Sequence, residues 1–341
     1  MSSQDLERRF ALLGNTPSGW TADAEIRVQS WMQDRKLIRS PQAVRRFAAT
    51  RAGDFVGRTY ATAVSADLLT VSAEWISWLF VIDDQLDEGE HGRDPAAAVR
   101  RLEPLMDRLR TLTLRPGSED PLEAGLADVW HEVRMRMPAD WARTFADDVR
   151  GYLQGCIWEA GNRAAHRVPD INEYLPMRRL AGAIWPSFSL LEVVSEASLP
   201  TGMQDDLLLR ELRTTAADVV CWTNDVQAME KEDAQGDVHN LAIIIRESRH
   251  CGTETARGLA MDLISLRLAD FARREAQLDD WLERTGVAPE DQRRVRLHVQ
   301  GLKDWMRGHM DWGQTTVRYN EIEHTIGLPS YLEDLTVVKA V

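Results

Sequence analysis

The sequence has few lysines, few cysteines and no long apolar run. Lysine occurs only at positions 36, 231, 303 and 339, and 54 acidic residues against 41 basic ones give a net charge of −13. That acidity argues against a nucleic-acid partner. No run of about 18 uncharged apolar residues occurs, so no membrane span is predicted. The N-terminal residues lack the charged-then-apolar pattern of a signal peptide, and we expect a cytoplasmic protein.

The three cysteines, Cys156, Cys221 and Cys251, lie far apart and form no C-x-x-C pair. This spacing excludes a disulfide scaffold and the usual zinc sites. With 44% hydrophobic and 28% charged residues among 341, the chain can bury a large core. The 12 tryptophans outnumber the 7 phenylalanines, which suits either an aromatic-lined cavity or ordinary core packing.

Apolar residues recur with helical spacing, as in the stripe from Leu68 to Ile82, and no sustained alternation predicts a strand. Turn-forming stretches separate the predicted helices at 16–19, 89–95, 115–117, 168–170, 235–237 and 286–289. No linker or repeat divides the chain. We therefore predict an all-α fold in a single domain over 1–341, with residues 1–20 as a mobile end and 320–341 as a C-terminal lid or tail.

An apolar helix is predicted to end in a cluster of acid, Asp-Asp-Gln-Leu-Asp-Glu, at residues 83–88. Asp83 and Asp87 would lie about 40° apart around the helix axis, with Asp84 beside them. Their oxygens can converge on Mg²⁺, which prefers oxygen ligands and bridges to phosphates. The alternative is a solvated acidic helix end.

A second set of polar residues has the spacing of one helical face. Positions 224, 228 and 232 advance by fours and stack over about 12 Å. Asn224 and Glu232 can hold a metal between them, whereas Ala228 has no ligating atom, so a water must fill that position. A surface helix with i,i+4 charge pairs is the alternative.

Together these motifs resemble those of bacterial class I terpene synthases. That family carries D-D-x-x-D/E and, well over a hundred residues later, N-D-x-x-S-x-x-x-E followed by G-D-x-x-N. Residues 83–88 match the first motif, and residues 224–240 match the second except at Ala228. The separation from Asp83 to Asn224 is 141 residues, which is of the family's order.

Three further segments carry the same resemblance. Residues 173–182 are similar to the family's pyrophosphate-sensing segment, which implies Arg178 as sensor, Ala181 as linker and Gly182 as effector. Residues 305–319 resemble the segment that ends in the diphosphate-capping Arg-Tyr pair, and residues 158–163 also look familial.

The chain departs from the family pattern at three positions. Ala228 replaces the usual Ser or Thr ligand, His309 stands where Asn is common, and Ala61 stands where Pro is often found. The first departure puts the metal shell on this helix in doubt.

The resemblance implies a single-domain helical bundle around a central apolar cavity that holds three Mg²⁺ and an isoprenyl diphosphate. The implied metal ligands are Asp83, Asp84, Asp87, Asn224 and Glu232. The implied diphosphate and catalytic residues are Arg178, Ala181, Gly182, Lys231, Arg318 and Tyr319. The candidates for stabilising a carbocation are Phe80, Trp185 and Trp312, for which core packing is the alternative.

The expected reaction is ionisation and cyclisation of a linear isoprenyl diphosphate with release of diphosphate. We favour farnesyl diphosphate, with geranylgeranyl diphosphate as the alternative, because small residues at 181–183 leave room for a longer chain. A chain-elongating synthase is disfavoured because Asn224-Asp225 stands where a second aspartate-rich motif is needed. A non-catalytic diphosphate-binding relative is supported only by Ala228. Homodimers are common in such folds, but no sequence feature identifies an interface or the product.

Overall fold

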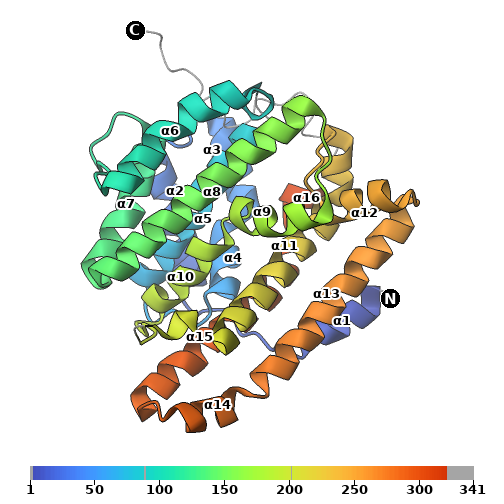
Figure 1. The fold of residues 1–341 in the computed structure, drawn as a ribbon. Helices are drawn as coiled ribbons and strands as arrows, with labels where there is room; N and C mark the ends of the chain where they lie inside the picture. Colours follow the sequence, from blue (N-terminus) through green and yellow to red (C-terminus); the bar gives the residue numbers. More distant parts are fainter. Residues whose placement is uncertain (1–2, 88–89, 201, 321–341) are drawn as a thin grey trace.

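The computed structural model describes residues 3–87, 90–200 and 202–320, and every regular element in these ranges is a helix (Figure 1). The α-helices are α1 (Ser3–Ala11), α2 (Thr21–Asp34), α3 (Pro41–Thr50), α4 (Ala52–Thr59), α5 (Ala66–Asp87), α6 (Pro95–Thr111), α7 (Pro121–Arg136), α8 (Ala139–Ala165), α9 (Ile171–Ala181), α10 (Ile184–Val194), α11 (Leu207–Gln235), α12 (Leu241–Arg249), α13 (Thr253–Glu275), α14 (Leu278–Thr285), α15 (Pro289–Gly313) and α16 (Val317–Asn320). Two short 3₁₀ helices, η1 (Glu90–Arg93) and η2 (Met203–Asp205), join them. The predicted all-α fold class is confirmed.

Polar caps set the start of the helices that carry the later functional residues. Asp170 accepts hydrogen bonds from Asn172 N at 2.8 Å and Glu173 N at 3.2 Å, which begins α9. Asn240 caps α12 in the same way. Such caps satisfy backbone N–H groups that have no partner within the helix. The predicted turn regions at 168–170 and 235–237 lie at these junctions.

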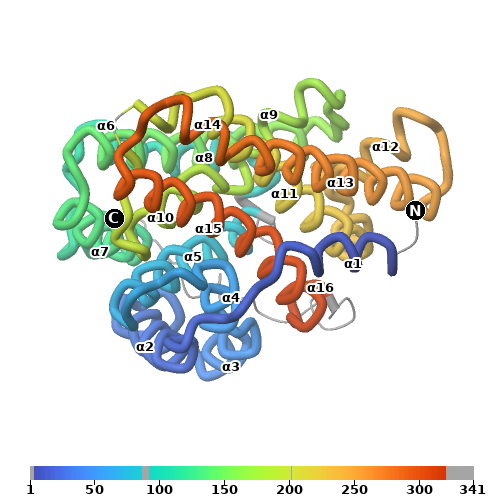
Figure 2. The backbone as a smooth tube through the Cα atoms, turned by 90° about the horizontal axis from the view of Figure 1, so that it is seen from below, coloured from blue at the N-terminus to red at the C-terminus, as the bar shows by residue number. Residues whose placement is uncertain are grey.

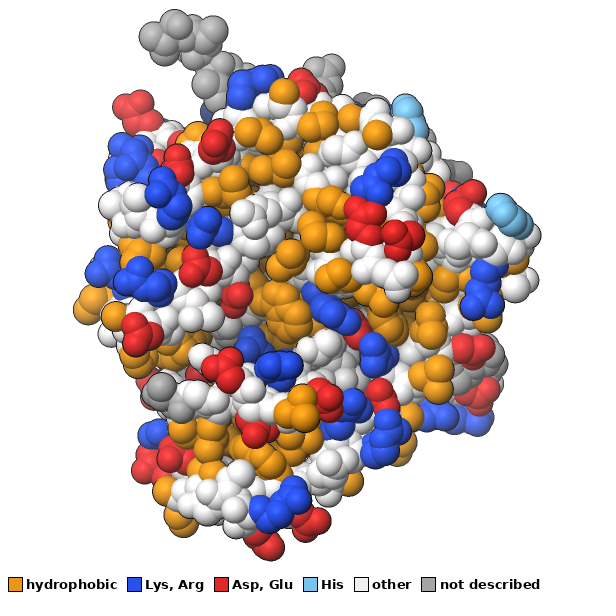
Figure 3. Space-filling view, viewed as in Figure 1, with side chains coloured by type: hydrophobic (Ala, Val, Ile, Leu, Met, Phe, Trp, Pro, Cys, Tyr) orange, Lys and Arg blue, Asp and Glu red, His pale blue; other side chains and the backbone are white. Residues whose placement is uncertain are grey.

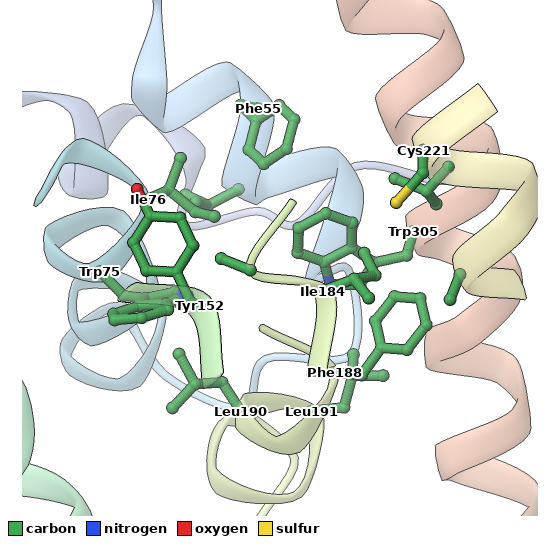
Figure 4. Packing of buried hydrophobic residues seen from close by; sticks show 14 of the residues in the cluster. Phe55, Trp75, Ile76, Tyr152, Ile184, Phe188, Leu190, Leu191, Cys221 and Trp305 are labelled. Atoms are coloured by element: carbon green, nitrogen blue, oxygen red, sulfur yellow. The ribbon is translucent and has the colours of Figure 1, made fainter. Parts of the chain in front are cut away.

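Helix α5 is buried in the middle of the bundle, where it packs against α2, α4, α7 and α10. Trp75 and Trp78 stack on each other at 5.6 Å, and their indole N–H groups donate to Ser187 Oγ and to the Leu122 carbonyl, each at 2.9 Å. Figure 4 shows this packing around Trp75 and Tyr152. The predicted apolar stripe is therefore core, and it fixes the direction in which α5 delivers its acidic end.

Long helices close the bundle on the other side. Helices α8, α11 and α13 run roughly parallel in Figure 1, and α11 packs on both α13 and α15. In Figure 2, α15 lies between the group α2 to α4 and the pair α11 and α13. No helix of the described chain has the length and apolarity that a membrane crossing requires.

Helix α1 packs against α13 and α15 (Figure 2). That residues 1–20 form a mobile end stays a prediction. Leu6 and Phe10, four residues apart, face inward together and are buried. The pattern of two apolar positions in nine residues was too short to predict this docking. The predicted C-terminal lid falls on residues that, from 321 onward, lie outside those described.

The surface combines charges of both signs. Figure 3 shows acidic and basic side chains intermingled across one face, with hydrophobic side chains between them. Many are paired, as where Arg101 makes a two-pronged contact with Asp120 at 2.8 and 2.9 Å. On this face, therefore, the acidic residues do not gather into a separate negatively charged patch.

Candidate active site

A cavity of about 150 Å³ lies between α4, α5, α8, the α9–α10 junction, α11, α15 and α16. One end is apolar, with Phe55, Ile184 and Trp305 around it, as Figure 4 shows. The other end is polar and is lined by Asp83, Glu159, Arg163, Arg178, Asn224, Glu232, Asp237, His239 and Tyr319. An apolar pocket below a dense set of charged groups is the usual form of a small-molecule site.

The acidic end of α5 forms the first polar wall. Arg318 of α16 donates to Asp84 through Nη1 at 3.1 Å and Nη2 at 2.8 Å, and to Asp83 through Nη2 at 3.2 Å. Its guanidinium also lies 4.4 Å from the ring centre of Phe80. Burial alone would raise the pKa of Asp84, but Arg318 outweighs it and holds that pKa below its usual value. Asp87 ends α5, and its side chain lies outside the described structure.

Helix α11 forms the second wall. Asn224 accepts a hydrogen bond from Arg178 at 2.6 Å and donates one to the Tyr319 hydroxyl at 2.6 Å. About two turns further along the same face of α11, Glu232 accepts a hydrogen bond from Asn240 at 2.8 Å. Burial and the neighbouring carboxylates raise the pKa of Glu232 to about 8. Ala228 is buried between them and offers only a methyl group.

Asp225, although part of the same motif, points into the protein and not into the cavity. It accepts from Arg178 at 2.9 Å and from the backbone N–H of Leu241 at 3.0 Å, and it also bonds the Tyr174 hydroxyl. It is fully buried. Asp225 therefore joins α9, α11 and the start of α12, and it fixes the orientation of Arg178.

The break between α9 and α10 brings Arg178 close to α11. A Cβ on Gly182 would lie 3.0 Å from Arg178 Nη1 and 3.2 Å from Cys221 Sγ, so glycine permits this close approach. Ala181 lines the cavity, but its methyl cannot accept a hydrogen bond from Arg178. Arg178 donates instead to Asn224 and Asp225, and the linker role that the resemblance implied for Ala181 stays a prediction.

Of the predicted diphosphate and catalytic residues, Lys231 and Arg318 are not part of the cavity lining, within the part of the chain that is described. Lys231 is partly buried. Burial raises the pKa of Asp83, and the charge of Lys231 is one of those that oppose this rise and that lower the pKa of Asp84. Lys231 therefore lies on α11, the second wall, and is close enough to the aspartates of α5, the first wall, to act on them electrostatically.

A third polar group at the cavity belongs to α8 and to the loop after α11. Arg163 donates to Asp237 at 2.8 Å and pairs with Glu159 at 3.6 Å, while His239 bonds Asp237 and Asn162. Both segments belong to the motifs that carry the family resemblance, but no role was predicted for these particular residues. The signal was present in the motifs, because residues 158–163 and 236–240 both carry the resemblance.

Aromatic rings line the apolar end. Phe80 and Trp312 stack at 5.7 Å with planes 9° apart, and the Trp312 indole donates to the Thr50 carbonyl at 3.0 Å. The sequence did not identify Phe55 and Trp305, which also line this end. Their contact across α4 and α15 depends on helix packing, for which no local pattern gives a signal.

Trp185 does not belong to this lining, and its predicted place in the pocket is wrong. Its ring lies 5.9 Å from the Arg213 guanidinium. Ile184 and Ser187 take the cavity face of α10 instead, because successive residues of a helix point about 100° apart.

The donor set fits a divalent cation. Asp83, Asn224 and Glu232 present oxygen atoms to one cavity from two walls, and hard cations prefer such ligands. The pKa of Glu232 is raised because burial and the nearby carboxylates outweigh the charge of Arg178, and a bound cation would favour the charged carboxylate. Among the residues described, no three acidic, histidine or cysteine side chains already form a metal cluster.

Comparisons with known proteins agree with this geometry. Residues 74–270 match the family model described as terpene synthase family 2, C-terminal metal binding. The chain is 33% identical over 257 residues to a (−)-delta-cadinene synthase of Streptomyces clavuligerus, covering 74% of this chain and 76% of the relative. It is 31% identical to a (+)-T-muurolol synthase of Roseiflexus castenholzii, covering 78% and 79%. The crystal structure of a linalool/nerolidol synthase from Streptomyces clavuligerus superposes with a TM-score of 0.79 at 26% identity, covering 88% and 98%.

Proposed function

Because this chain belongs to the bacterial class I terpene synthase family, we propose that it is a Mg²⁺-dependent cyclase of a linear isoprenyl diphosphate, with farnesyl diphosphate as substrate. One observation carries the proposal. A single cavity joins two oxygen-bearing walls, two arginines and a tyrosine at its polar end to stacked aromatic rings at its apolar end. These are the two environments that ionisation and cyclisation require.

Ionisation of the allylic C–O bond leaves charge on the departing diphosphate, so fixed cations at the polar end accelerate it. When bound, three Mg²⁺ held by Asp83, Asp84, Asp87, Asn224 and Glu232 would supply most of that positive charge. Arg178 and Arg318 would grip the diphosphate as planar forks, and Tyr319 would donate a hydrogen bond. Lys231 adds a point charge from α11.

Substrate binding has to move Arg318. In the structure its guanidinium is bound to Asp83 and Asp84, the same carboxylates that are proposed to hold metal. A diphosphate offers this arginine stronger acceptors and frees the carboxylates, so substrate and metal would favour each other's binding. Arg178 is held in place by Asp225 throughout, since that contact lies behind the cavity wall.

The apolar end would fold the chain and protect the carbocation. Phe80 and Trp312 present aromatic faces, whose electron-rich quadrupole attracts a cation. Phe55 and Trp305 extend this wall with edge-to-face contacts at 5.4 and 4.8 Å between Phe55 and the two tryptophans. A dry aromatic wall lets the cation rearrange before water reaches it.

Farnesyl diphosphate is favoured over geranylgeranyl diphosphate by the relatives. The T-muurolol synthase is described as farnesyl-diphosphate cyclizing, and another relative, 28% identical, as a 4-epi-cubebol synthase that also cyclizes farnesyl diphosphate. Tyr152 and Ile184 line the cavity together with the small residues at 181–183, and the longer C20 chain is the alternative.

The test is to incubate the purified protein with Mg²⁺ and, separately, the C10, C15, C20 and C25 isoprenyl diphosphates, and to analyse the extract by gas chromatography–mass spectrometry. A cyclic C15 product supports the proposal, and a product only from the C20 substrate moves it to the alternative. A folded protein that forms no product from any of them would contradict the proposal and favour a non-catalytic binding protein.

A further inference from the structure

A neutral histidine without a hydrogen-bond partner lines the cavity. His309 lies on α15, is 5% exposed, and packs edge-on against Phe55 at 6.1 Å. Its Nδ1 is buried and has no partner among the described residues. Burial, with the nearby charge of Arg178, lowers the pKa of His309 to about 3. The ring is therefore uncharged at neutral pH and keeps one nitrogen lone pair.

Histidine His239, at the polar end of the same cavity, provides a contrast. Its Nδ1 lies 2.8 Å from Asp237 and its Nε2 lies 3.1 Å from the amide nitrogen of Asn162. Both ring nitrogens are thus occupied. These contacts hold the loop after α11 against α8, so His239 serves to position that loop.

The other titratable groups of the apolar region are weak bases. Burial raises the pKa of the Cys221 thiol to about 12 and raises that of the Tyr152 phenol well above its usual value. Both groups are therefore neutral, and a neutral thiol or phenol accepts a proton poorly. Within the described lining, His309 is left as the basic nitrogen at the apolar side.

The position of His309 suits contact with a hydrocarbon chain. It lies four residues after Trp305 and three before Trp312, so all three side chains share one face of α15 and line the same cavity. The imidazole shares this face with two tryptophans and packs against Phe55. It can therefore lie against carbon atoms of a bound chain.

We propose that His309 is the base that ends the reaction, by taking a proton from the carbon next to the cationic centre of the last carbocation. The C–H bond breaks, its electron pair forms a C=C bond, and the proton binds the free imidazole nitrogen, which becomes positively charged. The proton then passes to the diphosphate as the products leave. This inference rests on the proposed function, and it adds that the product is a hydrocarbon and not an alcohol.

The test compares product profiles of matched histidine variants. His298 lies on the same helix, is equally buried with both nitrogens unpartnered, has a pKa that burial lowers to about 3, and is not part of the cavity lining. We would incubate the wild type, His309→Asn, His309→Gln and the control His298→Asn with Mg²⁺ and farnesyl or geranylgeranyl diphosphate. Released diphosphate reports ionisation, and gas chromatography–mass spectrometry reports the ratio of hydrocarbons to alcohols.

We expect a hydrocarbon from the wild type and from His298→Asn. In both His309 variants the share of that hydrocarbon should fall at least about tenfold, because a positioned base contributes about 10² to 10⁴ to proton transfer. Alcohols or other alkene isomers should replace it, and the change in product should exceed the change in diphosphate release.

Three outcomes would overturn the assignment: an alcohol as the main wild-type product, an unchanged profile in folded His309→Asn, or loss of diphosphate release in that folded variant. The second would indicate that diphosphate takes the proton. If neither variant folds, the wild-type product remains a test, because an alcohol as the main product would still overturn the assignment. Failure of the proposed function looks different, because the wild type itself would then release no diphosphate from either substrate.

Discussion

Asp84 on α5 and Asp225 on α11 are both buried carboxylates beside the same cavity, yet they are held in different ways. Both oxygens of Asp84 accept from Arg318, which reaches them from the short last helix α16. Asp225 is bound by two side chains of α9 and by the backbone of α12. The first contact is made by one flexible side chain, whereas the second connects three helices.

This difference separates adaptable from fixed parts of the site. The α5 wall can exchange its arginine for other cations without disturbing the bundle. The α11 wall cannot, because its hydrogen bonds also hold α9 and α12 in place. We therefore expect substitution of Asp225 on α11 to affect both stability and turnover, and substitution of Asp83 on α5 to affect mainly turnover.

The largest effects should come from removing one carboxylate from each wall. Asp225→Ala leaves Arg178 buried without its partner, and we expect it to lower the free energy of unfolding by about 3 to 5 kcal/mol. Asp83→Ala removes a half-exposed side chain and should cost less than about 1 kcal/mol, while turnover falls at least about 100-fold. Urea unfolding and a diphosphate-release assay measure the two quantities. An equal loss of unfolding free energy in the two variants would contradict the distinction between an adaptable α5 wall and a fixed α11 wall.

Arg318→Lys tests the adaptable wall next. Lysine keeps the charge but loses the two-pronged contact with Asp84, and with it the proposed grip on diphosphate. We expect kcat/KM to fall about 100-fold, with thermal unfolding within a few degrees of the wild type. Arg101→Lys, which alters a similar two-pronged pair with Asp120 on the surface, serves as the control and should leave kcat/KM unchanged. A comparable loss in both variants would contradict a role for Arg318 in the site.

A smaller effect is expected from Gly182→Ala on the fixed side. The new methyl would lie 3.0 Å from Arg178 Nη1, so the guanidinium has to shift by a few tenths of an ångström. We expect kcat/KM to fall about tenfold, because misplacement by 1 Å can cost about 10². Gly258→Ala, in α13 with open space around it, should keep full activity and gain about 0.5 to 1 kcal/mol. Unchanged kinetics in Gly182→Ala would show that Arg178 need not be so closely packed.

The smallest effect belongs to Ala228→Ser, which adds an oxygen between Asn224 and Glu232. We expect turnover to be kept or improved, and the Mg²⁺ concentration for half-maximal rate to fall by at most about tenfold. Ala217→Ser, also buried on α11 but seven residues before Asn224 and therefore not between the two proposed ligands, is the control and should leave the Mg²⁺ requirement unchanged. A higher Mg²⁺ requirement in Ala228→Ser would indicate that the methyl is needed for packing.

The sequence predicted the polar end of the site better than the apolar end. Asp83, Asn224, Glu232, Arg178 and Tyr319 were selected in advance, and the structure brings them to one cavity. Asn224 and Glu232 share one face of α11 because residues four and eight apart on a helix point the same way, whereas Arg178 and Tyr319 were named from the family's motifs. The roles assigned to them as metal or diphosphate ligands remain predictions.

The apolar end depends on how distant helices pack, and there the sequence was less informative. Phe55 and Trp305 meet across α4 and α15, which are separated by more than two hundred residues. Trp185 was a candidate for the cavity with core packing as its alternative, and its ring lies beside the Arg213 guanidinium. An apolar residue can suit a core or a cavity equally well, and only the tertiary arrangement decides between them.

The ion pair between Arg318 and the α5 aspartates has a practical consequence for handling the protein. Since Arg318 already pairs with both carboxylates, of which Asp84 is buried, chelation should leave the fold intact, unlike in small domains that unfold without their metal. Protein and substrate can then be mixed in EDTA and the reaction started by one pulse of metal salt. Such a synchronous start would allow the order of ionisation, ring closure and product departure to be followed in time.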